Sequence, residues 1–376
     1  MKDLIIKETG NSRNLKSSIG EISWEEARAL LQAGTFPIDL LGLNPDGVQQ
    51  TGTALNKANL LSDSTKTALE LTQSDPTVND ALYALSQKGS PAEVHVIADN
   101  NTTVTMSKDG KVLSARVSGG EAVLYPTVLG DWQLTYTFNS QQKTRTYTLE
   151  VIGIVTVYPF EIGDDLEDTE WADIGICSQL GMAQQFFKVG DTKTVNIGGV
   201  NYQVQIIGFN HDDLTSGGKA GITFQMVDCL NATAQMNSSN TNVGGWNSSA
   251  MRSRMSTYLS QLPSALQSVI KSVNKKSGTG NGSSSGTQTT SDKLFLLSEI
   301  EIFGTTTYSV SGEGNQYEWY KAGNSRIKKV NGSANSWWER SPYGGNAGNF
   351  CVVFSDGNAN YNYANTGGGV SFGFCV

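Results

Sequence analysis

The sequence predicts a multidomain α+β protein, and three observations support this prediction. The chain has 376 residues, more than one hydrophobic core normally serves, so we expect two or three domains. Its charged fraction is 16%, below the roughly 25% of ordinary soluble domains, and its 41 glycines indicate many turns between strands. Apolar residues alternate through the middle of the chain, whereas helical spacing returns between residues 250 and 273.

The charge pattern argues against nucleic acid as a partner. The net charge is −8, and the basic residues are scattered without the clusters that neutralise phosphates. No run of about 18 apolar residues is present, so we expect no membrane insertion. Residues 1–8 lack the apolar core of a signal peptide, and we expect synthesis in a cytoplasm.

Residues 1–89 are predicted to be an attachment and oligomerisation segment with short helices. Ser23 stands at an N-cap position and Glu26 at the capping-box position three residues later. Two further short helices are expected at 57–61 and 75–85. Helices this short do not make a monomeric core, so the segment should pack against its own copies or a larger assembly.

Residues 90–160 are predicted to be an immunoglobulin-like β-sandwich. Alternation is clearest where Trp132, Leu134, Tyr136 and Phe138 share one face of a strand. Turn signals separate the segments at intervals typical of sandwiches. Further strands are expected at 94–98, 103–106, 111–117 and 146–151.

Residues 171–376 are predicted to form one α+β domain. A hairpin is expected at 194–209, a strand at 222–226, and a helix after Trp246 that buries Met251, Met255 and Leu259. A second helix should open at Pro263. The Gly/Ser-rich run 276–286 is expected to be a flexible excursion, followed by a buried strand at 292–299 and by paired strands at 351–354 and 370–374.

No metal site, cofactor or catalytic set emerges from the sequence. The four cysteines lack CxxC spacing, so we expect buried reduced thiols, with a Cys351–Cys375 disulfide as the alternative. The acidic residues at 164–170 lack the spacing of a calcium loop. His95 and His211 are far apart, and Asp212-Asp213 has no visible partner, so we expect no enzyme.

Two groups of motifs resemble known families. The run Gly-Thr-Ala-Leu-Asn-Lys-Ala-Asn-Leu-Leu at 52–61, with residues 34–40, is similar to the N-terminal part of phage and prophage tail-fibre proteins. The segments 246–252, 292–298 and 337–342, followed by a terminal strand after three glycines, resemble C-type lectin-like domains. They are also similar to the variable proteins of diversity-generating retroelements, although the Gly-x-Arg-Pro ending of many members is absent.

The resemblance implies that residues 171–376 are a receptor-binding domain. It also implies a location on the virion tail, contact with tail or baseplate proteins, a homotrimer, and a bacterial cell-surface receptor, glycan or protein. Trp337 and Trp338 should point to opposite faces of a strand, one into the core and one towards the Asn/Gly-rich tract that follows. Arg340 could form an ion pair with its neighbour Glu339.

The candidate ligand-binding residues are tyrosines and asparagines of the Asn/Gly-rich tract. Tyrosine gives rigid amphipathic contact area and asparagine gives both donors and acceptors, as in antibody paratopes. The alternative is that Asn and Gly only satisfy turn geometry. The residues concerned are Tyr343, Asn346, Asn349, Asn358, Asn360, Tyr361, Asn362, Tyr363 and Asn365.

The sequence therefore favours a phage tail adhesin. Two alternatives stay open: a tail-associated enzyme that degrades envelope polysaccharide, which would need carboxylates converging in a groove, and a structural decoration protein without a receptor.

Overall fold

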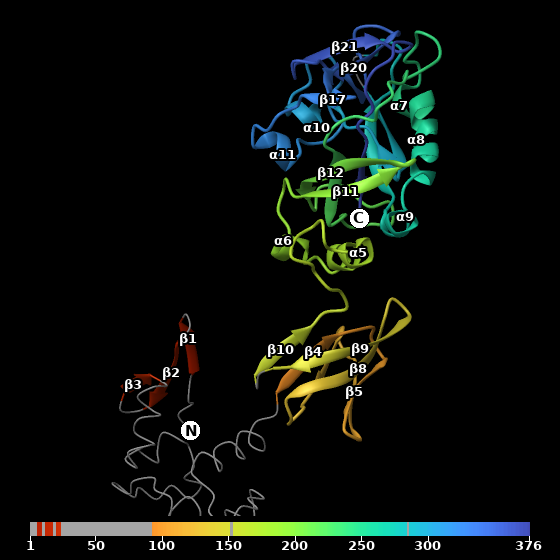
Figure 1. Ribbon diagram of the computed structural model, residues 1–376. Helices are drawn as coiled ribbons and strands as arrows, with labels where there is room; N and C mark the ends of the chain where they lie inside the picture. Colours follow the sequence, from red (N-terminus) through yellow and green to blue (C-terminus); the bar gives the residue numbers. More distant parts are fainter. Residues whose placement is uncertain (1–5, 10–11, 18–19, 24–91, 151–152, 284–285) are drawn as a thin grey trace, which may run out of the picture. The chain divides into compact units, whose positions relative to one another are not determined.

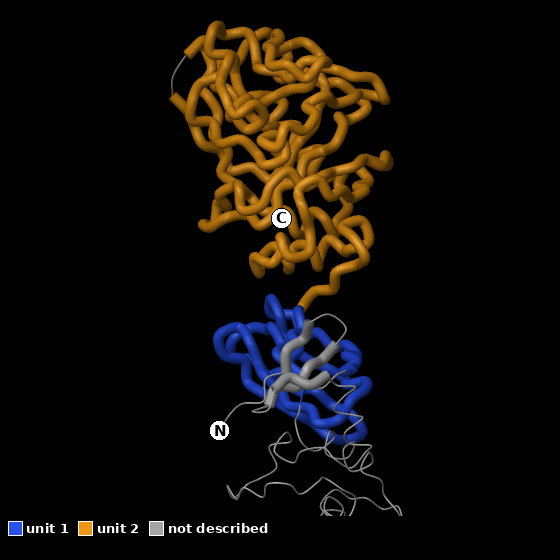
Figure 2. Tube along the Cα trace, turned by 90° about the vertical axis from the view of Figure 1, so that its left-hand side faces the viewer, with its two compact units in different colours: residues 1–158 blue, residues 159–376 orange. Residues whose placement is uncertain are grey.

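Two compact units make up the chain, residues 1–158 (unit 1) and residues 159–376 (unit 2), drawn in separate colours in Figure 2. The computed structural model describes residues 6–9, 12–17, 20–23, 92–150, 153–283 and 286–376. Both units are built mainly from sheets, and helices are confined to unit 2 among the described residues (Figure 1). The architecture is therefore mixed α+β, as the sequence predicted.

The described part of the N-terminal segment consists of strands. Three short strands form an antiparallel sheet in the order β1-β2-β3. The helices expected at 57–61 and 75–85, and all but the first residue of the one expected from Ser23, lie outside the described residues. Ser23 itself ends a strand; the three strands are β1 (Ile6–Thr9), β2 (Ser12–Ser17) and β3 (Gly20–Ser23).

Seven further strands of unit 1 form two sheets, in the orders β10-β4-β7 and β6-β5-β8-β9. The predicted alternation is confirmed on β8, where Trp132, Leu134, Tyr136 and Phe138 are all buried. The sequence missed β7 and β10, which are only four residues long. The strands are β4 (Glu93–Ile97), β5 (Thr103–Lys108), β6 (Lys111–Arg116), β7 (Glu121–Leu124), β8 (Gly130–Phe138), β9 (Gln141–Leu149) and β10 (Ile154–Val157).

A five-stranded sheet with the order β11-β12-β13-β22-β16 forms the centre of unit 2. The C-terminal strand is inserted between two strands that precede it by at least 78 residues, and Phe374 stacks on Phe224 with ring centroids 5.2 Å apart. The expected hairpin at 194–209 and strand at 222–226 are present. The strands are β11 (Thr192–Ile197), β12 (Val200–Phe209), β13 (Ile222–Met226), β16 (Leu294–Phe295) and β22 (Gly373–Cys375).

Short helices pack around this sheet. Trp171 of α5 packs edge-on against Phe224 and Phe374, and Met251 and Met255 of α8 are buried as predicted, whereas Leu259 is half-buried. Pro263 caps the start of α9, as expected. The helices are α5 (Trp171–Gln179), α6 (Ala183–Phe186), α7 (Gly245–Ser248), α8 (Ala250–Ser260), α9 (Ser264–Val269), α10 (Glu299–Phe303) and α11 (Glu318–Lys321).

A second sheet, β19-β20-β21, carries the Asn/Gly-rich tract, and two hairpins accompany it. The prediction that 351–354 pairs with 370–374 is wrong, because β20 lies between β19 and β21 while β22 belongs to the central sheet. The remaining strands are β14 (Val273–Gly278), β15 (Thr287–Asp292), β17 (Lys328–Val330), β18 (Ser333–Asn335), β19 (Trp337–Pro342), β20 (Asn349–Val353) and β21 (Ala359–Tyr363).

The Gly/Ser-rich run 276–286, expected to be a flexible excursion, begins inside a strand. Residues 276–278 belong to β14, which pairs with β15 over six residues. The strand alternates, with Val273, Lys275 and Ser277 buried, but its inward residues include polar ones, which hid the pattern in the sequence. The expected strand at 292–299 is also divided, into the two-residue β16 and the start of α10.

In unit 2, β20 and β21 lie at the end opposite α5 and α6 (Figure 1). No helix among the described residues is long and apolar enough to cross a membrane.

Candidate ligand-binding surface

Three tyrosines from separate segments form an aromatic cluster at the β20–β21 end of unit 2. The rings of Tyr343 and Tyr361 stack in parallel, with centroids 4.2 Å apart and an interplanar angle of 4°. Tyr308 meets both rings edge-on, at 5.1 Å from Tyr361 and 5.9 Å from Tyr343. Such pairs add about 0.5–1.5 kcal/mol beyond area burial. The tyrosines therefore support one another as a rigid platform.

Each tyrosine is held by its own backbone contacts. The buried Glu299 carboxylate accepts hydrogen bonds from the Tyr308 amide, at 3.1 and 3.0 Å to its two oxygens. The Tyr343 amide donates to the Asn349 carbonyl at 3.0 Å. Tyr361 pairs with Cys351 across the β20–β21 ladder. Since Tyr308 is 35 residues away from Tyr343, sequence reasoning missed it.

Asn242 is a second residue that the sequence did not reveal. It is fully buried, and its Nδ2 donates to the carbonyls of Tyr343, Asn346 and Asn349 at 3.2, 2.8 and 2.7 Å. Its Oδ1 accepts from the Asn281 amide at 2.8 Å. One side chain therefore fixes the loop that presents Tyr343.

Most of the predicted asparagines do lie at this surface. Their side-chain oxygens accept local amide bonds: Asn346 from Gly348, Asn360 from Tyr361 and Asn362 from Tyr363, each at 2.8 Å. Their Nδ2 groups make no hydrogen bond to another described residue. Asn358, whose Nδ2 bonds Asp356 at 2.9 Å, and Asn365 are exposed as well.

Asn349 does not belong to this surface. Its side chain is only 4% exposed, and its Oδ1 is buried without a hydrogen-bond partner. It begins β20, where every residue is buried. By contrast Tyr361 and Tyr363 are 36% and 58% exposed. The residues called the Tyr/Asn surface below are the exposed Asn346, Asn358, Tyr361, Tyr363 and Asn365 and the half-buried Tyr308, Tyr343, Asn360 and Asn362.

The two tryptophans below the surface are both scaffold. The expectation that one of them points towards the Tyr/Asn surface is wrong, because Trp337 and Trp338 are each 0% exposed. Their indole nitrogens donate to the carbonyls of Arg326 and Ala234, at 2.9 and 2.7 Å. Layers of structure cover both faces of β19, so alternation does not separate core from surface here.

Arg340 pairs with Glu301 of α10 and not with its neighbour Glu339. Nη1 donates to Glu301 Oε2 at 2.5 Å and Nη2 to Oε1 at 2.7 Å, a bidentate contact. Lys275 joins the cluster through Glu301 at 2.7 Å and Asp212 at 2.6 Å. Burial alone would raise the pKa of Glu301, but Arg340 and Lys275 lower it. Asp212-Asp213, which had no visible partner in the sequence, thus contributes one member of a buried ion network.

Glu339, unlike its neighbour Arg340, is buried without an ion-pair partner. Its carboxyl oxygens are both buried without a hydrogen-bond partner among the described residues. Burial, and then the nearby carboxylates of Glu299 and Glu313, raise its pKa well above the ordinary value. Burial without a hydrogen-bond partner therefore favours the protonated, neutral form of Glu339.

One cluster of described residues brings potential metal ligands together, and a lysine already occupies it. His211, Asp212 and Glu301 bring ligand atoms within 4.8 Å of one another, but the Lys275 ammonium already bonds both carboxylates. The four cysteines, all in described segments, are buried and free, so the Cys351–Cys375 pair does not form.

A family model for a domain of unknown function, DUF6273, matches residues 220–376. No curated protein and no solved structure matches the chain. The matched region contains the whole Tyr/Asn surface and the residues that support it.

Proposed function

We propose that the chain is a receptor-binding protein of a phage or prophage tail, which attaches the virion to a bacterial surface ligand. The observation that carries this proposal is the three-tyrosine platform surrounded by asparagine donors. Stacked tyrosines offer a flat amphipathic contact area at low entropic cost, and the amides offer hydrogen bonds around it. Such a surface suits recognition of a glycan or a protein loop.

The proposed domain assignments follow the resemblances in the sequence. Residues 171–376 would be a C-type lectin-like receptor-binding domain, similar to the variable proteins of diversity-generating retroelements, and residues 90–160 an immunoglobulin-like spacer. The difference in burial within residues 337–376 supports this idea: Trp337, Trp338 and Arg340 are fully buried, whereas the Tyr/Asn surface residues of this range are exposed or half-buried. Variation at the exposed residues would leave the scaffold in place.

Binding without catalysis is part of the proposal. A polysaccharide-degrading enzyme needs two carboxyl groups at an open groove. Asp212, Glu301 and Glu313, which unit 2 brings together, are instead buried and hydrogen-bonded. Glu299 and Glu339 beside them are buried as well. Residues 1–89 would attach to tail or baseplate proteins, and a homotrimer would multiply weak contacts into useful avidity.

The test is adsorption of the fluorescently labelled full-length chain to a panel of bacterial strains. Strains that bind the parent should lose at least tenfold in bound protein with the variant Tyr343→Ala/Tyr361→Ala, since that change removes the stacked pair. Tyr125→Ala is the matched control, because Tyr125 is 53% exposed but lies in unit 1.

Equal binding by the double variant and the control would refute the site, and absence of binding to every strain would refute the adhesin function. Release of soluble sugar from bound cells would favour the enzyme instead.

A further inference from the structure

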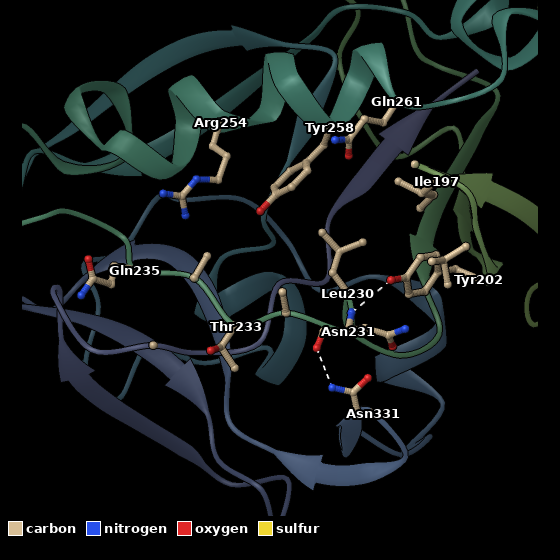
Figure 3. A pocket seen from close by; sticks show the side chains of 15 residues that line it. Ile197, Tyr202, Leu230, Asn231, Thr233, Gln235, Arg254, Tyr258, Gln261 and Asn331 are labelled. Atoms are coloured by element: carbon tan, nitrogen blue, oxygen red, sulfur yellow. Dashed lines mark hydrogen bonds between the residues drawn. The ribbon is translucent and has the colours of Figure 1, made fainter.

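An open groove with a volume of about 860 Å³ lies on unit 2, apart from the Tyr/Asn surface. Figure 3 shows its three walls: α8 with Arg254 and Tyr258, the β11–β12 hairpin with Ile197 and Tyr202, and the loop that carries Leu230 and Thr233. Small-molecule sites usually measure about 300–1,000 Å³. The groove therefore has room for a short oligosaccharide.

The floor of the groove is fixed by hydrogen bonds. The Asn231 amide donates to the Tyr202 hydroxyl at 3.1 Å, and Asn331 Nδ2 donates to the Asn231 carbonyl at 2.7 Å (Figure 3). Ala234 exchanges backbone bonds with Gly368 at 2.9 and 3.0 Å. A binding surface that is already ordered loses little entropy when a ligand arrives.

The groove is also equipped for an anion. None of its 15 lining residues carries a carboxylate, although the chain as a whole has a net charge of −8. Arg254 is its only cationic lining residue, projects into it (Figure 3) and forms no ion pair with any described carboxylate. The guanidinium hydrogen-bonds the Tyr258 side chain and no described carboxylate, so its remaining N–H groups are suited to bind a planar carboxylate of a ligand.

The other polar lining groups suit hydroxyls. Asn231 and Gln261 present amides, which both donate and accept, as sugar hydroxyls do. Gln235 and Asn331 also line the groove, but each already donates one hydrogen bond to a carbonyl, of Asn365 at 2.5 Å and of Asn231 at 2.7 Å. The Tyr258 ring stands beside Arg254 and is held from behind by Phe372, with the rings stacked at a centroid distance of 6.0 Å. It gives one flat face against which a pyranose ring can pack.

We propose that this groove is a second binding site, for a carboxylated saccharide such as a uronic-acid oligomer. Arg254 binds the carboxylate, Tyr258 packs on a sugar ring and the amides bind the hydroxyls. No residue of the Tyr/Asn surface lines the groove, although the lining residue Gln235 donates to the Asn365 carbonyl. Tyr343 and Tyr361, whose substitution tests the proposed function, do not line it, so the two proposals can fail separately.

Calorimetric titration of the full-length chain with tri-galacturonic acid tests the proposal. We expect saturable binding that is at least tenfold tighter than binding of the neutral analogue galactotriose. Arg254→Gln, a helix-compatible change, should weaken binding of tri-galacturonate at least tenfold. The variant should then bind tri-galacturonate and galactotriose with equal affinity. Lys293→Gln removes the same charge from an exposed residue outside the groove and should change nothing.

Two further variants separate this site from the Tyr/Asn surface. Tyr258→Leu should weaken the binding of both saccharides, whereas Tyr361→Ala should leave the binding of both unchanged. The proposal is overturned if tri-galacturonate does not bind at millimolar concentration, or if Arg254→Gln binds it as the parent does. Equal, Arg254-dependent binding of tri-glutamate would overturn the saccharide assignment and indicate an acidic peptide.

Discussion

Replacing Arg340 by Met should destabilise unit 2 strongly, because every donor of this buried guanidinium is used. Besides the two bonds to Glu301, Nε donates to the Lys276 carbonyl at 2.9 Å, Nη1 to the Leu296 carbonyl at 2.9 Å and Nη2 to the Glu313 carbonyl at 2.7 Å. Five bonds thus meet the five N–H groups of the fork. Methionine would fill much of the space but remove five hydrogen-bond donors from these buried acceptors.

The expected cost is about 3–5 kcal/mol in the free energy of unfolding, the usual result of removing one partner of a buried ion pair. Lys275 stays bonded to Glu301, so that carboxylate keeps one cation. The neighbouring change Glu339→Met is the matched control. It removes a neutral acid whose oxygens have no partner, and we expect no loss, or a gain of up to about 1–2 kcal/mol.

Urea unfolding followed by tryptophan fluorescence measures both variants, since Trp337 and Trp338 lie on the same strand as the two substituted residues. The free energies should separate by at least about 3 kcal/mol at pH 7. Equal losses, or a larger loss for Glu339→Met, would refute the assignment of Arg340 as the centre of the buried network.

Three further predictions concern single residues. Burial raises the pKa of Glu313 to about 7, so the folded state binds the carboxyl proton of Glu313 more tightly than the unfolded chain does. The stabilisation from this proton is complete below pH 4.5 and is lost as the pH rises through 7. Glu313→Gln should therefore flatten the fall in unfolding free energy between pH 5 and 8. Asn242→Ala should cost about 1–3 kcal/mol in urea unfolding and speed hydrogen exchange at 343–349, and unchanged exchange would contradict its role. Burial raises the pKa of the Cys177 and Cys229 thiols to about 12, so iodoacetamide should modify neither residue until urea unfolds the chain, as mass spectrometry can show.

Local sequence patterns predicted the strands whose apolar and polar residues alternate and the helices whose first residues and apolar spacing are regular. Five strands of unit 1 (β4, β5, β6, β8 and β9), the β11–β12 hairpin and the buried methionines of α8 were visible in the sequence. Pairings across long distances were not. Nothing local indicates that β22 belongs between β13 and β16, because that position depends on packing of Phe374 against Phe224 and Trp171.

The candidate surface was predictable in composition but not in geometry. Exposure of Tyr361 and Tyr363 follows from their place on the edge strand β21, and Asn349 was misjudged because it looks like its exposed neighbours until β20 is seen to be buried. Tyr308 and Asn242 could not be found, since each reaches Tyr343 only through the fold. Arg340 was assigned to Glu339 by adjacency, although successive residues on a strand point to opposite faces.

The buried ion network explains how unit 2 can carry an exposed tract of Asn and Gly that buries little apolar area. Glu299 holds the Tyr308 loop, Asn242 holds the Tyr343 loop, and Arg340 fixes β19 on α10 through Glu301. None of these bonds uses a side chain of the Tyr/Asn surface: they reach the backbone or one another. Substitution of a tyrosine or asparagine of that surface therefore leaves these particular bonds in place, as the proposed receptor-binding role requires.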